Sequence, residues 1–137
     1  WKLIIIPIFI ALGSLMGSVL SGLFFGFATG ESAAVGAGFG WYSLSGVLIS
    51  KLHSTELGSI AFLTNVFREL LTVIILPLVA KYFGSLAAIA PGGATTMDVT
   101  LPLVKESGGE AVVIPAFVSG AVLSALVPIL VPLFLNF

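Results

Sequence analysis

The sequence predicts an all-α integral membrane protein with about five membrane-embedded segments, at least one of them an interrupted (broken or re-entrant) helix. Of the 137 residues, 58% are hydrophobic and only 8% are charged, whereas a soluble domain carries about 25% charged residues. Five basic and six acidic side chains are too few to cover a soluble globule of this size, which argues against that alternative. We therefore expect the lipid bilayer to be the main surrounding of this chain.

Five apolar segments follow one another along the chain. Three of them are continuous and long enough to cross a bilayer, which takes about 20 residues; they are residues 3–29, 57–80 and 111–137. The other two are irregular, because residues 32–50 contain four glycines and residues 84–104 are interrupted by the string APGGATTMDVTLP. Only short loops join these segments, so the chain is expected to form a single membrane domain over residues 1–137.

Lysines near the segment ends predict the orientation in the membrane. If all five segments cross, Lys2, Lys51 and Lys105 share one side and Lys81 lies on the other. Cytoplasmic loops are enriched in Lys and Arg, so we expect the N-terminus inside and the C-terminus outside. Lys105 changes side if residues 84–104 enter and leave on one face.

The segment 57–80 carries polar residues in the string FLTNVFRELLTV. On a helix, Asn65, Glu69 and Thr72 lie within about 60° of one another, flanked by Arg68. A charged group at the middle of a span costs about 2.5–3.5 kcal/mol and usually marks a functional site. One interpretation is a structural ion pair or clamp between helices. We favour a wet substrate or ion site in which Glu69 binds the proton or cation and Arg68 fixes a carboxylate or carbonyls.

A helix break is predicted at Pro91, Gly92 and Gly93, because proline lacks a backbone donor and glycine tolerates non-helical dihedral angles. Freed backbone groups persist at membrane depth only against protein or a water-filled cavity, and transporters bind substrates and ions at such breaks. The alternative is an interfacial loop exposed to water. The candidate ligands that follow the break are one carboxylate and three hydroxyls, from Asp98, Thr95, Thr96 and Thr100.

The string GAGFGWYSLSG suggests a second unwound stretch, with Tyr42, Ser43 and Ser45 as candidate ligand contacts. The alternative is that its aromatic residues only mark a membrane interface. The single histidine, His53, and the absence of cysteine leave no metal-binding cluster. No hydrolase, P-loop or dinucleotide motif is present, so we expect no enzyme activity, no cofactor and no metal. No basic patch indicates nucleic acid binding.

Three strings together resemble the lysine exporter (LysO) family of inner-membrane proteins: GFGWYSLSG (38–46), FLTNVFREL (62–70) and PGGATTMDVTLP (91–102). The resemblance covers essentially the whole chain and implies export of L-lysine and its toxic analogues, driven by proton exchange. Family members are about twice as long, and this chain resembles their C-terminal half. The resemblance also implies one important intramembrane acidic residue in each half, which is Glu69 here. The chain is therefore expected to join a partner chain that supplies the N-terminal half, to form a homo-oligomer, or to be a fragment of a longer protein.

We predict a secondary transporter, or a half or subunit of one, that exports L-lysine or a related cationic amino acid through the inner (cytoplasmic) membrane. The expected coupling ion is H⁺ rather than Na⁺. Glu69 would alternate between the proton and the substrate, while Asn65, Ser43 and the residues after the break supply oxygen ligands. The alternatives are a cation/proton antiporter or channel-forming subunit with another substrate, and a non-transporting assembly subunit whose buried charges fix helix register.

Overall fold

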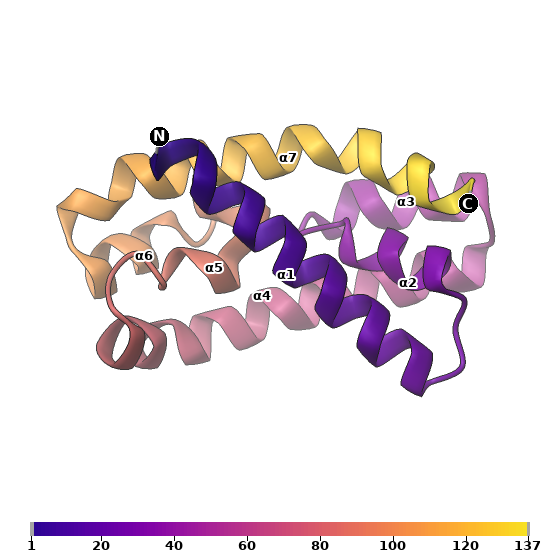
Figure 1. The fold of residues 1–137 in the computed structure, drawn as a ribbon, viewed down its shortest axis with the longest axis horizontal. Coiled ribbons are helices and arrows are strands. Elements are labelled where there is room, and N and C mark those ends of the chain that lie inside the picture. The colour runs from indigo at the N-terminus through magenta and orange to yellow at the C-terminus, as the bar shows by residue number, and fades with distance from the viewer. Residues whose placement is uncertain (1, 137) are drawn as a thin grey trace.

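Three long helices form the frame of the molecule (Figure 1), as seen in a computed structural model that describes residues 2–136. They are α1 (Lys2–Phe24), α4 (Thr55–Phe83) and α7 (Val113–Leu135). In Figure 1, α4 and α7 run antiparallel along the molecule, and α1 crosses them diagonally. Each of the three is long and apolar enough to cross a membrane, at the positions of the three continuous runs in the sequence.

Two helical hairpins fill the space between the long helices. The first hairpin consists of α2 (Thr29–Gly36) and α3 (Tyr42–Leu52). The second hairpin consists of α5 (Ile89–Gly92), the 3-10 helix η1 (Gly93–Met97) and α6 (Leu101–Gly108). A short 3-10 helix, η2 (Glu110–Val112), connects it to α7. Neither hairpin contains a helix of the roughly 20 residues that a bilayer crossing takes. The two irregular segments of the sequence are thus hairpins in the part of the chain that the structure describes.

The hairpins approach the centre from opposite ends of the molecule (Figure 1). The first lies beside the start of α4 and the second beside its end. As a result α6 packs against the end of α4, so Lys105 on α6 and Lys81 on α4 lie at the same end of the molecule. Lys51 belongs to α3, which lies at the other end. Five crossings would have placed Lys51 and Lys105 on one side of the membrane and Lys81 on the other. The arrangement differs because each hairpin returns to the end of the molecule from which it started.

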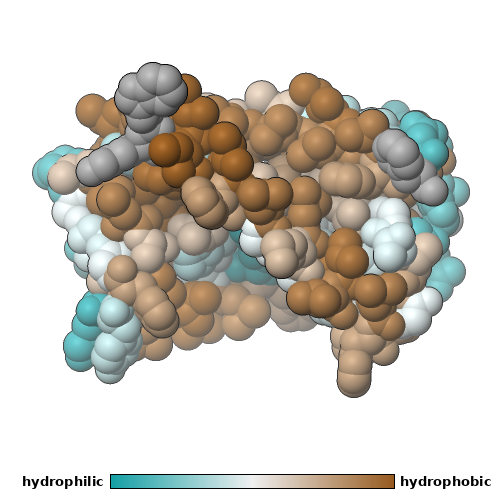
Figure 2. Space-filling view, in the orientation of Figure 1, coloured by the Kyte–Doolittle hydropathy of each residue, from teal (hydrophilic) through white to brown (hydrophobic). Residues whose placement is uncertain are grey.

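The outer surface is apolar and the interior contains polar side chains. Figure 2 shows hydrophobic residues over α1, α4 and α7, and hydrophilic residues at the two ends and in a hollow between α1 and α4. Contiguous exposed apolar surface of this extent marks a surface that faces lipid or another protein. The buried polar residues are Ser32, Ser45, Asn65, Thr72, Thr95, Thr96, Thr100, Ser119 and Ser124. The chain is therefore an all-helical membrane protein that is apolar on the outside and partly polar within.

Candidate functional site

The tips of the two hairpins touch at the centre of the molecule. The backbone N–H of Ala94 donates to the carbonyl of Phe39 at 2.8 Å, which joins η1 to the turn of the first hairpin. Gly40 and Gly93 both have positive φ, +98° and +59°, a region that favours glycine. A Cβ atom on Gly93 would collide with the Phe39 carbonyl. Glycine is therefore required here so that the two backbones can cross.

Asn65 on α4 holds the tip of the first hairpin. It is 3% exposed, and its Oδ1 accepts the Gly40 N–H at 2.7 Å. Its Nδ2 donates to the carbonyls of Ala61 at 2.9 Å and Val35 at 3.3 Å. The amide is thus occupied by the backbone of the chain, and the oxygen predicted as a ligand is already engaged.

Arg68 lies one turn further along α4 and holds the second hairpin. Its Nε donates to the Pro91 carbonyl at 3.2 Å, and its Nη2 to the Ala90 carbonyl at 3.4 Å. Its Nη1 reaches across to Ser14 Oγ on α1 at 2.9 Å, and Thr72 Oγ1 lies 2.9 Å from the same Pro91 carbonyl. The carbonyls of Ala90 and Pro91 are satisfied in this way, as hydrocarbon surroundings require. Of the three residues predicted to break the helix, Pro91 and Gly92 lie inside α5, and the backbone leaves the α-helical conformation at Gly93.

Glu69 faces a different space from its neighbour Arg68. It lines a cleft of about 210 Å³ enclosed by α3, α4, η1 and α7. Its Oε2 is buried and has no hydrogen-bond partner. Among the side chains that the structure describes, the ion pair Lys105–Glu110 and the imidazole–carboxylate contact His53–Glu31 are the close contacts between basic and acidic groups, so Arg68 and Glu69 are not paired with each other.

A second carboxylate faces the same cleft. Asp98 is exposed, and its Oδ1 accepts the Val99 N–H at 2.6 Å, which leaves its other oxygen for a ligand. The cleft is therefore lined by two acidic side chains of this chain, Glu69 and Asp98. The other predicted residues that line this acidic cleft are Tyr42, Ser43 and Thr95.

The remaining predicted residues support the backbone of the hairpins instead; they are Ser45, Thr96 and Thr100. Thr96 Oγ1 lies 2.9 Å from the Ala116 carbonyl on α7, and the hydroxyls of Thr95 and Thr100 are 3.1 Å apart. Ser45 donates to the Trp41 carbonyl at 2.9 Å. These buried hydroxyls fix the backbone from which the cleft is built.

One residue of the cleft, Ser124 on α7, was not among the predicted ligands. The available signal was its spacing, because Ala116, Gly120 and Ser124 lie four residues apart on one helix face. A Cβ on Gly120 would collide with the backbone of Met97 in η1, so this face packs directly on the second hairpin. Small residues permit such close packing, and the same face carries Ser124 to the cleft.

The chemistry of the acidic cleft suits a cation. Two carboxylates face it, and no described basic side chain neutralises either of them. Hydroxyls of Ser43, Thr95 and Ser124 add neutral oxygen atoms around the same space. Acidic groups inside a membrane protein mark ion or substrate pathways because their burial is costly without a partner. A proton or a cationic ligand would supply the missing positive charge.

Comparison with known proteins gives a consistent assignment. The family model described as "Lysine exporter LysO" matches residues 1–135. The chain is 36% identical over 130 residues to the lysine exporter LysO of Escherichia coli K12, covering 95% of this chain and 43% of that protein. It is 39% identical over 126 residues to a Haemophilus influenzae protein named as a candidate lysine exporter, covering 92% of this chain and 64% of that protein. The chain thus spans about half the length of these relatives, and no solved structure matches it.

Proposed function

The chain belongs to the lysine exporter LysO family, and from that premise we propose that it is part of a secondary transporter that exports L-lysine or a related cationic amino acid. Two relatives carry lysine export in their names, which supports amino-acid export as the function. The observation that carries the proposal is the acidic cleft, where Glu69 and Asp98 face one space without a basic partner. The bacterial inner membrane is the proposed location.

In this proposal α1, α4 and α7 cross the membrane, and the two hairpins enter it from opposite faces. Their tips then meet near mid-depth, where the bonds from Ala94, Asn65 and Arg68 satisfy the non-helical backbone. Backbone of this kind is tolerated in a membrane only where it is covered by protein or lines a cavity. In this proposal the five embedded segments expected from the sequence are three crossings and two re-entrant hairpins.

The distribution of lysines supports a cytoplasmic position for the end that contains α6. Lys81 and Lys105 lie at that end, where α1 also begins, and Lys51 lies at the other. Positive residues concentrate in cytoplasmic loops. The N-terminus of the described chain is then inside and its C-terminus outside.

Proton exchange follows from the charge of the substrate. Moving one positive charge outward against an inside-negative potential costs about 2.3 kcal/mol per 100 mV. Exchange of one H⁺ for one cationic amino acid cancels that charge. We assign the alternation to Glu69, which holds the proton after the substrate leaves and releases it to bind the next ammonium group. Asp98 and the neighbouring hydroxyls complete the site.

In this proposal the rest of the transporter comes from a further part of the same protein, from a second chain or from a second copy of this one. The alternative of a non-transporting assembly subunit fits Asn65 and Arg68, whose polar atoms bond to backbone. It does not fit Glu69, whose Oε2 bonds to nothing in the described structure. A channel would need no saturable site and no coupling to protons.

The test is lysine exchange in proteoliposomes containing the complete transporter. Glu69→Gln keeps the shape of the side chain but removes its charge, and we expect exchange to fall at least tenfold, which corresponds to about 1.4 kcal/mol. Glu106→Gln is the matched control, because Glu106 is exposed on α6 and lines neither the acidic cleft nor any other substrate space proposed below. Undiminished, pH-dependent exchange by the Glu69 variant would remove this residue from the mechanism.

A further inference from the structure

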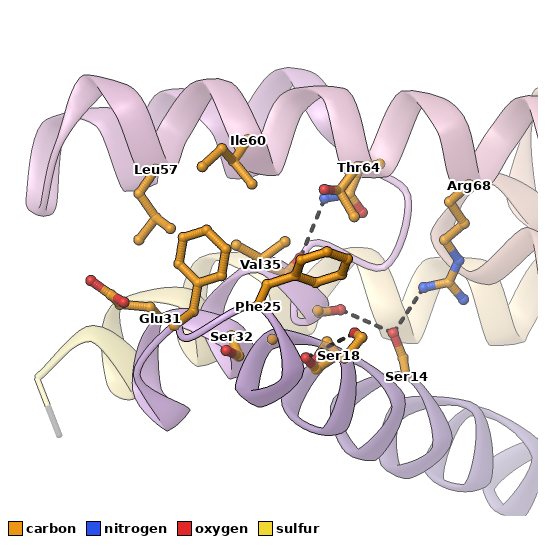
Figure 3. A pocket seen from close by; sticks show the side chains of 15 residues that line it. Ser14, Ser18, Phe25, Glu31, Ser32, Val35, Leu57, Ile60, Thr64 and Arg68 are labelled. Atoms are coloured by element: carbon orange, nitrogen blue, oxygen red, sulfur yellow. Dashed lines mark hydrogen bonds between the residues drawn. The ribbon is translucent and has the colours of Figure 1, made fainter.

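A second and larger cavity lies on the other side of the hairpin crossing. It has a volume of about 520 Å³ and is enclosed by α1, α2 and α4. Figure 3 shows Arg68 at one end of this cavity and Glu31 at the other, with serines of α1 along one wall. We call this space the vestibule. Its lining includes Ser14, Ser18, Ser32, Ile60, Thr64 and Arg68.

The charge of Arg68 is not neutralised by any described side chain. A guanidinium has five N–H donors and stays protonated in proteins, and three of them go to neutral oxygens of Pro91, Ala90 and Ser14. Two N–H groups are left without a partner in the described structure, and the side chain lines the vestibule. A charge that is partly removed from water without a counter-ion is unfavourable, whereas a carboxylate bonds well to a guanidinium. The inner end of the vestibule is therefore suited to an anionic group.

The outer end has the opposite charge. Glu31 lies there and forms a 3.4 Å contact with His53, and Glu56 lines an adjoining pocket that shares Glu31, Leu57 and Ile60 with the vestibule. A simple anion would have to pass two carboxylates before it reached the arginine. A molecule with both an ammonium and a carboxylate group is attracted by both ends.

From this polarity we infer that the vestibule is a second amino-acid site, in which the carboxylate of the substrate rests on Arg68. The inference builds on the proposed function and adds how the substrate is recognised. The crossed tips at Gly40 and Gly93 separate the vestibule from the acidic cleft, so one molecule occupies the two sites in succession. The vestibule is long, because Leu57 and Arg68 both line it and a separation of eleven residues along a helix corresponds to about 16 Å. A space of this length forms a path for the substrate rather than a closely fitting pocket.

These 137 residues contain no cysteine. A single cysteine introduced here therefore permits a direct test by labelling, in a complete transporter whose remaining part is also made free of cysteine. Ile60→Cys reports on the vestibule and Val99→Cys on the acidic cleft, because each residue lines one of these spaces and makes no side-chain hydrogen bond. The rate of reaction with a small water-soluble thiol reagent is measured with L-lysine or with L-lysine methyl ester, which lacks the carboxylate. We expect L-lysine to slow labelling at both positions. At Ile60→Cys the ester should need at least tenfold higher concentration for the same effect.

The outcomes separate the inference from the proposed function. Equal protection of Ile60→Cys by lysine and its ester would overturn the carboxylate contact, and so would protection of Val99→Cys alone. Protection of Ile60→Cys alone would instead overturn the assignment of the cleft. Equal protection by inorganic phosphate, or only in vesicles rich in anionic lipid, would show a general anion or headgroup site and refute the amino-acid assignment.

Substitution of the arginine gives a second measurement. In an Arg68→Lys background, the preference of Ile60→Cys for lysine over the ester should fall to less than about threefold, because an ammonium cannot bind a carboxylate through a planar pair of donors. Lys81→Arg is the matched background and should leave that preference intact, because Lys81 is exposed in the last turn of α4 and lines neither the vestibule nor the acidic cleft. An unchanged preference with Arg68→Lys would refute the inference. The ester comparison in the unsubstituted arginine background does not depend on how well this variant folds.

Discussion

Replacing Asn65 by alanine tests whether this residue acts as a scaffold for the first hairpin. Its Oδ1 is the acceptor for the Gly40 N–H, which is buried and has no other partner in the described structure. The Val35 carbonyl keeps the N–H of Gly38, and the Ala61 carbonyl keeps its bond within the helix. The substitution therefore leaves one buried donor without a partner, and we expect the free energy of unfolding to fall by about 2 kcal/mol, within the 1–3 kcal/mol typical of such a group.

The measurement is unfolding in mixed micelles, followed by circular dichroism during titration with a denaturing detergent. Asn136→Ala is the control, because Asn136 is exposed and its amide makes one bond to the Pro132 carbonyl. We expect this surface change to stay within about 0.5 kcal/mol. If Asn65→Ala were as stable as the control variant, the amide would not hold the hairpin tip, and Asn65 would return to the set of candidate ligands.

Three further predictions concern the crossing and the coupling ion. Gly93→Ala should lower the free energy of unfolding by at least about 1 kcal/mol, because alanine is strained at the positive φ of this position and its Cβ would collide with the Phe39 carbonyl. The control is Gly13→Ala, whose added Cβ meets open space; it should be neutral or stabilising by up to about 1 kcal/mol in the same assay. Thr96→Val should cost about 1 kcal/mol of stability through its lost hydrogen bonds, and an equal loss in the exposed control Thr64→Val would contradict that reason. Lysine efflux from proteoliposomes should bring protons inward, recorded by an internal pH dye, and proton movement that persisted with Glu69→Gln would refute the coupling.

The sequence was a good guide to the three long helices and to one position, Gly93, where the backbone adopts a non-helical conformation. Apolar length alone located α1, α4 and α7, because a bilayer imposes that length directly. The non-helical conformation of Gly93 was also predicted from its residue type, and the structure gives this glycine a positive φ. Both features depend on local chemistry, which a single sequence records.

The meeting of the two hairpins could not be predicted in the same way. The bond between Phe39 and Ala94 joins residues 55 positions apart, and hydrophobic periodicity carries no information about such a pairing. Residue type also did not separate scaffold from cleft, because an asparagine or threonine has the same atoms in either role. Asn65 and Thr96 were therefore grouped with Glu69, although their polar atoms bond to the backbone of the chain.

The polar face of α4 contains residues with two different roles inside the membrane protein. Asn65 and Arg68 satisfy backbone groups that the hairpins leave free, and they thereby offset the cost of their own burial. Glu69 lies on the same helix, yet its buried oxygen satisfies nothing in the described chain. A fold that needed only tight packing would tolerate a neutral side chain at that position. The scaffold gains nothing from this carboxylate, and in the proposed function it binds a positive charge that arrives from outside the chain and leaves again.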